Sequence, residues 1–257
     1  QFAQTVVQPF AGDYLRGRTP NPCVACNRDF KLGTWLAWAR EHGAEFVATG
    51  HYARIERDES SGAALFRGAD RGKDQSYFLF ALSPEQLVRT LFPLGEMRKA
   101  DVRDQARRLG LPAAERPESQ DICFGDHKAL VASYAGESDL TGGEVVDRGG
   151  KVLGRHTGIH GVTIGQRRGL GISGAEPHYV VDIDHQSKRV GLGKKSELDS
   201  IGLIARSVNW LDDGSEGEFA AEVQIRHRAP AAPCVIPRLD GDVCEVRFTE
   251  AGAAVTP

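Results

Sequence analysis

The chain has 257 residues, of which 40% are hydrophobic and 26% charged, as in an ordinary folded protein. A formal net charge of −3 excludes a global basic field for nucleic acid, although a local basic patch remains compatible with RNA binding. Five cysteines without regular spacing exclude the framework of a small disulfide-rich secreted protein and favour a reducing, cytoplasmic location. No apolar run approaches the ~18 residues that cross a bilayer, so we expect no membrane association.

The first distinctive stretch reads Gly17-Arg-Thr-Pro-Asn-Pro-Cys-Val-Ala-Cys-Asn27. Its two prolines fix their own φ and restrict the residue before each, which predicts a stiff, non-helical ribbon. The ribbon delivers Cys23 and Cys26 to the start of an amphipathic helix over residues 28–42. A Cys-x-x-Cys pair at a helix N-terminus predicts lowered thiol pKa values, because unpaired N–H groups favour a thiolate. On spacing alone, zinc binding and thiol chemistry are about equally well supported as roles of this pair, and inert cysteines are only slightly less so.

The first part of the chain has the pattern of an α/β fold. Apolar residues recur at helical spacing at Leu32, Trp35, Leu36 and Ala39, and Gly43 predicts the end of this helix. Residues 45–49 then read as a short buried strand that ends in Gly-His-Tyr. A helix followed by such a strand is typical of a parallel sheet, in which ligands lie beyond the carboxyl ends of strands.

Further helices and strands follow from local signals. We expect a strand over residues 63–67, a capped helix that starts at Ser83-Pro-Glu-Gln86, a helix over 99–109, hairpins over 142–154 and 179–192, and strands over 201–211, 219–228 and 243–249. The composition changes after about residue 134. These elements predict three parts, namely an α/β part over 1–134, a small central β-containing part over 135–199, and an incomplete β-barrel over 200–257.

The cysteines differ in their expected chemistry. Sulfur transfer needs one cysteine that holds sulfur and another that resolves the disulfide, and Cys26 and Cys123 suit these roles if the fold brings them together. Cys234 and Cys244 lie in strand-like sequence and are expected to be structural. A zinc site would need a second close pair, and the nearest candidates are two histidines far downstream, so the zinc interpretation loses ground.

Three polar segments have two interpretations each. His51 suits a phosphate or a base, or a hydrogen bond at a strand end. Lys73-Asp-Gln75 offers a cation, an acceptor and an amide in a row, or forms a solvated turn, and the residues alone favour the turn. Within the predicted strand 219–228, Arg226 and Arg228 would share one face and His227 the other, which suits phosphate contacts or an exposed salt-bridged face.

Five blocks in this order resemble the bacterial tRNA-specific 2-thiouridylase family. They are Gly17–Asn27 as quoted, Ala48-Thr-Gly-His-Tyr-Ala-Arg54, Lys73-Asp-Gln-Ser-Tyr-Phe-Leu79, Glu118-Ser-Gln-Asp-Ile-Cys-Phe124 and Thr163-Ile-Gly-Gln-Arg-Arg-Gly-Leu170. The resemblance implies an ATP-dependent sulfurtransferase that adenylates the C2 oxygen of the wobble uridine and replaces it with persulfide sulfur. It also implies the remainder of an adenine-nucleotide alpha-hydrolase-like domain, a central β-containing domain and a C-terminal β-barrel.

The resemblance implies a role for each matching residue. Cys26 matches the nucleophile and Cys123 the persulfide-carrying cysteine, and the reaction leaves a disulfide between them. Gly50 matches an ATP contact. The segment Asn21, Pro22, Cys23 matches a contact to the target base, and some members have Asp where this chain has Cys23. The implied tRNA contacts are His51, Lys73, Asp74, Gln75, Arg226 and His227, the last in place of a more usual tyrosine.

The resemblance also implies cofactors and partners. The cofactor is ATP with Mg²⁺, and the partners are tRNAs of the Lys, Glu and Gln type and a sulfur-carrier or cysteine desulfurase protein. The family's Ser-Gly-Gly-x-Asp-Ser phosphate loop lies before the position of Gln1, so we expect an internal piece of a longer protein that alone binds ATP poorly or not at all. A non-catalytic RNA-binding module and a zinc protein using Cys23 and Cys26 remain alternatives.

Overall fold

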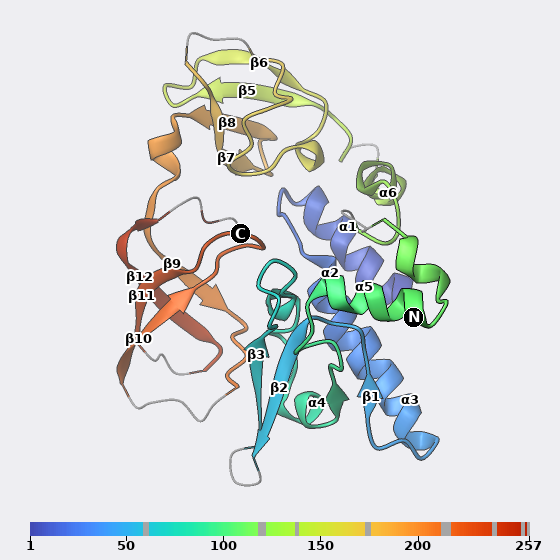
Figure 1. Ribbon diagram of the computed structural model, residues 1–257. Coiled ribbons are helices and arrows are strands. Elements are labelled where there is room, and N and C mark those ends of the chain that lie inside the picture. The colour runs from blue at the N-terminus through green and yellow to red at the C-terminus, as the bar shows by residue number, and fades with distance from the viewer. Residues whose placement is uncertain are drawn as a thin grey trace. The chain divides into compact units, whose positions relative to one another are not determined.

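The computed structural model describes residues 1–58, 62–117, 122–136, 139–172, 176–211, 217–237, 241–252 and 255 (Figure 1). Residues 118–121, most of the block that precedes Cys123, lie outside this part. The chain forms two compact units. The first comprises Gln1–Val6, Pro22–Cys123 and Asn209–Gly214, and the second Val7–Asn21, Phe124–Val208 and Ser215–Pro257.

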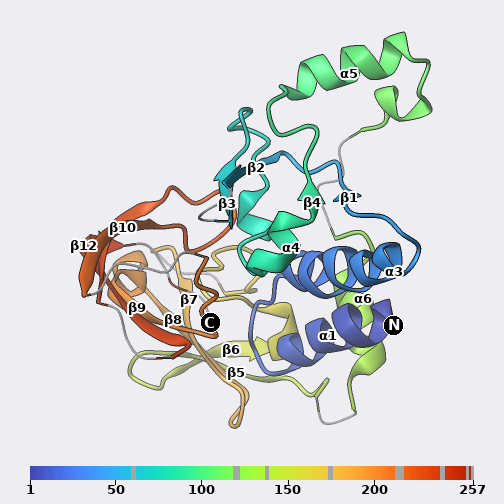
Figure 2. The ribbon, with the colours of Figure 1, turned by 90° about the horizontal axis from the view of Figure 1, so that it is seen from below.

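The helical elements, in chain order, are the π-helix η1 (Ala3–Val7), α1 (Gln8–Leu15), α2 (Pro22–Ala25), the π-helix η2 (Cys26–Thr34), α3 (Trp35–Glu41), the 3₁₀ helix η3 (Ser76–Phe78), α4 (Pro84–Val88), α5 (Lys99–Arg108), the 3₁₀ helix η4 (Pro112–Glu115), α6 (His127–Tyr134), and the 3₁₀ helices η5 (Ile159–Gly161) and η6 (Lys195–Leu198). Within the described residues, none of these helices combines the length and the apolar character needed to span a bilayer. Figure 2 shows α5 standing apart from α3 and α4 of the same unit.

The strands are β1 (Val47–Ala48), β2 (Ala53–Asp58), β3 (Gly62–Arg67), β4 (Thr90–Leu91), β5 (Gly143–Asp147), β6 (Val152–His156), β7 (Tyr179–Asp184), β8 (Arg189–Gly193), β9 (Ser200–Arg206), β10 (Glu218–Val223), β11 (Ala232–Pro237) and β12 (Val243–Gly252). In the first unit β1 pairs in parallel with β4, and β2 with β3 forms an antiparallel hairpin. The parallel pair confirms the predicted parallel pairing, although β1 is shorter than the predicted strand 45–49.

The helix that carries the Cys-x-x-Cys pair differs from the prediction. Residues 22–25 are helical, so the predicted non-helical ribbon ends before Pro22, whose ring suits the first position of a helix. The π-helix η2 then occupies the first half of the predicted helix, and α3 the second. Gly33 permits this arrangement, because a Cβ atom there would lie 2.7 Å from the carbonyl oxygen of Arg28. Gly43 follows the end of α3 with φ +83°, as predicted.

The core of the first unit anchors η2. Leu32 of η2 is fully buried together with the leucines at 79, 82 and 87 and with Ala53 of β2. Leu36 of α3 is also buried, whereas Trp35 of the predicted apolar face is 51% exposed. Burying a leucine side chain contributes roughly 2 kcal/mol, so this cluster is a main source of stability for the unit.

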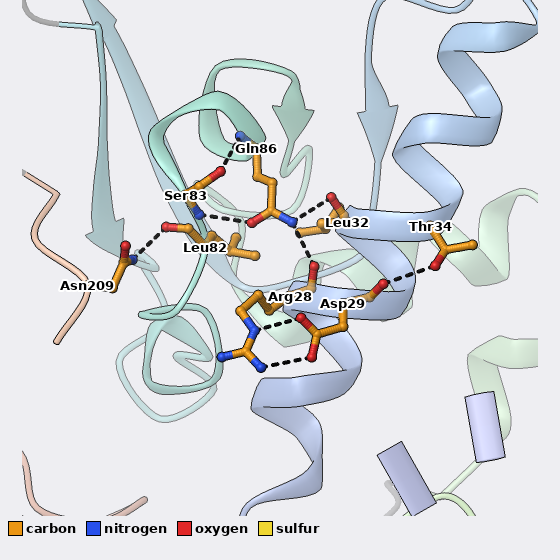
Figure 3. Close-up of polar contacts among 8 residues, drawn as sticks. All are labelled: Arg28, Asp29, Leu32, Thr34, Leu82, Ser83, Gln86 and Asn209. Atoms are coloured by element: carbon orange, nitrogen blue, oxygen red, sulfur yellow. Dashed lines mark hydrogen bonds and ion pairs between the residues drawn. The ribbon is translucent and has the colours of Figure 1, made fainter. Parts of the chain in front are cut away.

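The side chain of Gln86 connects α4 with η2 (Figure 3). Ser83 caps α4, as predicted, and its backbone N–H donates to Gln86 Oε1 at 2.9 Å. The Gln86 amide nitrogen donates to the carbonyl oxygens of Arg28 at 2.7 Å and Leu32 at 2.9 Å. One side chain therefore closes the capping box of α4 and fixes two carbonyls of the π-helix.

The second unit contains two four-stranded sheets, with strand orders β6-β5-β8-β7 and β10-β11-β12-β9. The predicted hairpins are confirmed as β5–β6 and β7–β8. The predicted strand 219–228 is too long, because β10 ends at Val223 and residues 226–228 form a turn in which Arg228 has φ +65°. The prediction that Arg226 and His227 point to opposite faces of a strand is therefore wrong.

Replacing Gln86 by alanine is expected to destabilise the first unit by about 1–3 kcal/mol, because two carbonyls of η2 lose their donor and α4 loses part of its cap. Denaturant unfolding of the two proteins measures the change. The matched control is Glu85→Ala, which removes an exposed ion pair with Arg40 and is expected to cost less than about 1 kcal/mol. Equal losses from the two variants would contradict the importance of the Gln86 contacts.

Candidate functional site

Three free cysteines of the first unit form one group. Cys23 lies in α2 and Cys26 begins η2, and Ala25 between them has helical φ and ψ of −60° and −42°. Residues three apart in a helix lie on the same face, with Cβ atoms about 5–6 Å apart. The thiolate of Cys123 would raise the pKa of both thiols, so Cys123 lies within electrostatic range of the pair. The structure therefore places Cys26 and Cys123 in one compact unit and within this range, which the sequence alone left open.

The thiols are less acidic than the sequence predicts. Burial raises the pKa of the half-buried Cys26 thiol above its ordinary value, and the nearby cation of Lys31 only partly offsets this. Cys23 is an exposed residue, yet the protein atoms around its sulfur raise the pKa of its thiol as well. The predicted lowering of the thiol pKa is wrong, because desolvation outweighs the favourable charges. Both cysteines are thiols at neutral pH in the resting chain.

Lys31 is a member of this group that sequence reasoning missed. Its charge lowers the pKa of Cys23, Cys26 and His51, and its side chain is half-buried. In an α-helix, five residues correspond to about 500° of rotation, which would place Lys31 well away from the face of Cys26. The i→i+5 bonding of the π-helix stacks the two positions instead. The only indication in the sequence was that Lys31 follows Cys26 by five residues. This spacing has no meaning if the segment is assumed to be an α-helix.

His51 follows the carboxyl end of β1 and is buried, with 8% exposure. Its Nδ1 lies 2.7 Å from Thr49 Oγ1, and its ring meets the edge of Phe92. Burial, helped by the charge of Lys31, lowers its pKa to about 4. His51 is therefore neutral at neutral pH and is a hydrogen-bonding group rather than a cation.

Gly50 lies between β1 and His51, at the strand end where nucleotides bind in parallel α/β sheets. A Cβ atom at Gly50 would meet Leu94 at 3.6 Å, an ordinary contact. The support for a nucleotide at Gly50 is therefore its position after the strand, and not a lack of space for a side chain. Within the described residues of the first unit, no glycine-rich loop that opens a helix accompanies it to hold phosphates.

The interpretation of Lys73-Asp-Gln75 as a solvated turn holds for Lys73, which ends the turn over residues 71–73, but not for Asp74 and Gln75, whose side chains bond to the protein. The Asp74 carboxylate accepts hydrogen bonds from the Gly68 N–H at 2.8 Å and the Ser76 hydroxyl at 2.7 Å. Gln75 Oε1 accepts from the backbone N–H of Tyr52 at 3.0 Å. These bonds hold Lys73 and its neighbours beside the segment that carries His51.

Asn27 links η2, the π-helix that begins at Cys26, to Phe78 in the block that follows Lys73. It is buried, with 2% exposure, and its Nδ2 donates to the carbonyl oxygen of Phe78 at 3.0 Å. Phe78 ends η3, which follows Gln75 directly. No sequence pattern singles out Asn27, because its hydrogen-bond partner lies 51 residues away along the chain.

The remaining site residues lie elsewhere. Pro22 is buried at the start of α2 in the first unit, and Asn21 is half-buried in the second. Arg226 and His227 are exposed in the turn after β10 of the second unit. In the described part of the chain, no group of three His, Cys, Asp or Glu side chains is placed to hold a metal ion.

Three protein-family models together match almost the whole chain. Residues 1–127 match the family described as tRNA methyl transferase HUP domain, 128–194 the tRNA methyl transferase PRC-barrel domain, and 200–257 the aminomethyltransferase beta-barrel domain. These matches confirm the predicted fold class.

Similar proteins include the tRNA-specific 2-thiouridylases MnmA of Geobacter metallireducens and Geotalea uraniireducens, each 47% identical over 260 residues. The MnmA of Solibacter usitatus is 45% identical over 269 residues. All of this chain is matched in each case. The matches cover 70%, 69% and 72% of the three relatives.

The low pKa of His51 predicts a pH dependence of stability. An unfolded histidine has a pKa near 6.5, so between about pH 6.5 and 4 the unfolded state binds more protons than the folded state. Stability therefore falls as the pH falls through this window, by about 3 kcal/mol in total from this group. The free energy of unfolding against pH, compared with that of His51→Asn, measures this term. Parallel curves for the two proteins would contradict the burial of a neutral His51.

Proposed function

Because this chain belongs to the tRNA-specific 2-thiouridylase family, we propose that it forms 2-thiouridine at the wobble position of tRNA by ATP-dependent sulfur transfer from a cysteine persulfide. The single observation that supports the mechanism is that Cys26 and Cys123 belong to one compact unit, within electrostatic range of each other. A sulfur transfer that ends in a disulfide requires two such cysteines.

Cys123 carries the sulfur that is transferred. It is exposed, so a sulfur-carrier or cysteine desulfurase protein can load a terminal sulfur on it as a persulfide. ATP, with Mg²⁺, supplies activation of the uridine C2 oxygen, which then leaves as part of AMP. The target base must leave its stack to reach the thiols, and an unpaired anticodon-loop base does so at modest cost.

Cys26 releases that sulfur. Its thiol loses a proton and its sulfur attacks the inner sulfur of the Cys123 persulfide. The bond to the terminal sulfur breaks, and this sulfur takes the electron pair to C2 of the uridine. A Cys26–Cys123 disulfide remains, and two electrons from a reductant restore the thiols. The Lys31 cation favours the Cys26 thiolate at the moment of attack.

The residues around the thiols position the substrates. We assign Gly50 to ATP and Asn21, Pro22 and Cys23 to the target base. We assign His51, Lys73, Asp74, Gln75, Arg226 and His227 to tRNA. The neutral ring of His51 supports a hydrogen bond rather than a phosphate ion pair, and the fixed Lys73–Gln75 segment supports a preformed contact.

We keep the division into parts over 1–134, 135–199 and 200–257, with the reactive cysteines in the first part. The bounds of the three family matches support it. The acceptor tRNAs are those of the Lys, Glu and Gln type with a wobble uridine.

The test supplies the full-length protein with ATP, Mg²⁺, a persulfide donor and unmodified tRNA, and measures 2-thiouridine by nucleoside mass spectrometry. Wild type is expected to form product, and Cys26→Ser and Cys123→Ser are expected to form none. Cys234→Ala, which removes a buried cysteine of β11, is the control and is expected to remain active.

Two results would contradict the proposal. Product from the Cys123→Ser protein would remove Cys123 from the role of sulfur carrier. Absence of product from wild type, with tRNA still bound, would identify a non-catalytic RNA-binding module.

A further inference from the structure

We propose that Cys23 is a third redox-active cysteine of the site. Its sulfur attacks Cys26 in the Cys26–Cys123 disulfide, forms a Cys23–Cys26 disulfide and frees Cys123 to accept a new sulfur. The inference rests on the proposed function, which leaves that disulfide after each turnover. Cys23 then has a chemical role in addition to its place beside the target base.

The helix places Cys23 within bonding range of Cys26. The backbone is helical from Pro22 to Cys26. In helical geometry residues three apart have Cα atoms about 5 Å apart, from a rise of 1.5 Å per residue and a 2.3 Å radius. Disulfides join residues with Cα atoms roughly 4.4–6.8 Å apart, so a Cys23–Cys26 bond needs no large movement of the backbone.

Cys123 belongs to the same compact unit as Cys23 and Cys26. It lies within electrostatic range of both, because its thiolate raises the pKa of the Cys23 and Cys26 thiols, and Lys31 acts on both members of the pair. Lys31 therefore stabilises the attacking thiolate at either position. The exchange stays within one compact unit.

The step is a thiol–disulfide exchange and balances without an added oxidant. Cys23 loses a proton to water, and its sulfur forms a bond to the Cys26 sulfur. The Cys26–Cys123 bond breaks, and Cys123 leaves as a thiolate with the electron pair. The chain stays oxidised by two electrons, now as Cys23–Cys26, until a thiol reductant supplies them.

The exchange frees the sulfur carrier. Cys23 and Cys123 are both exposed, whereas Cys26 is half-buried. A reductant in solution therefore reaches either disulfide through its exposed sulfur. Moving the disulfide from Cys123 to Cys23 leaves Cys123 as a free thiol that can accept a new sulfur before the oxidised pair is reduced.

Disulfide mapping tests the inference directly. The full-length protein is equilibrated in a glutathione redox buffer, quenched in acid, alkylated with N-ethylmaleimide and digested with trypsin without reduction. Trypsin releases Cys23 and Cys26 together in peptide 19–28, and Cys123 in peptide 109–128, whose one internal arginine precedes proline. A Cys23–Cys26 bond therefore appears as peptide 19–28 lighter by two hydrogens, and a Cys26–Cys123 bond as a cross-link between the two peptides.

In wild type we expect the internal bond of peptide 19–28 to exceed the cross-link by at least about tenfold, with Cys123 alkylated. A tenfold ratio corresponds to about 1.4 kcal/mol. Dominance of the cross-link in wild type would overturn the inference.

The variant Cys23→Ser separates this inference from the proposed function. It is expected to accumulate the cross-link between peptides 19–28 and 109–128. If both wild type and Cys23→Ser show the cross-link as the main disulfide, the inference fails and the thiol pair of the proposed function stands. If Cys23→Ser forms no cross-link, Cys26 and Cys123 do not meet, and the proposed function fails together with the inference.

Discussion

The side-chain amide of Gln86 is the interaction on which the site depends. It accepts from Ser83 at the start of α4 and donates to the carbonyls of Arg28 and Leu32 in η2. Those bonds fix a π-helix whose first residue is Cys26. The wider i→i+5 turn brings the Lys31 cation onto the face of Cys26. The capping of a short helix elsewhere in the unit thus determines which charge lies near the Cys26 thiol.

The electrostatics of the site favour neutral groups at rest. Burial raises the pKa of the Cys26 and Cys23 thiols and lowers that of His51, so all three are neutral near pH 7. Protonated thiols resist oxidation, because the thiolate is the reactive form. Lys31 is the nearby cation that favours ionisation. This balance suits a sulfur-transfer site that must hold several thiols close together without premature disulfide formation.

Elements with local signals could be predicted from the sequence, and those that depend on distant contacts could not. The Ser83 cap, the end of α3 at Gly43 and the two hairpins of the second unit follow from short-range rules. The π-helix was missed because its support comes from Gln86, far along the chain. Lys31 was missed with it, since an α-helical period places it on another face. The thiol pKa was predicted with the wrong sign because burial cannot be read from spacing.

Locating the persulfide on the chain tests the assignment of Cys123 as the sulfur carrier. The reduced full-length protein is loaded by a cysteine desulfurase with L-cysteine, trapped by alkylation and digested with trypsin. We expect one additional sulfur atom on peptide 109–128, which contains Cys123, and none on peptide 19–28. Additional sulfur on peptide 19–28 instead would contradict the assignment of Cys123 as the carrier and Cys26 as the nucleophile.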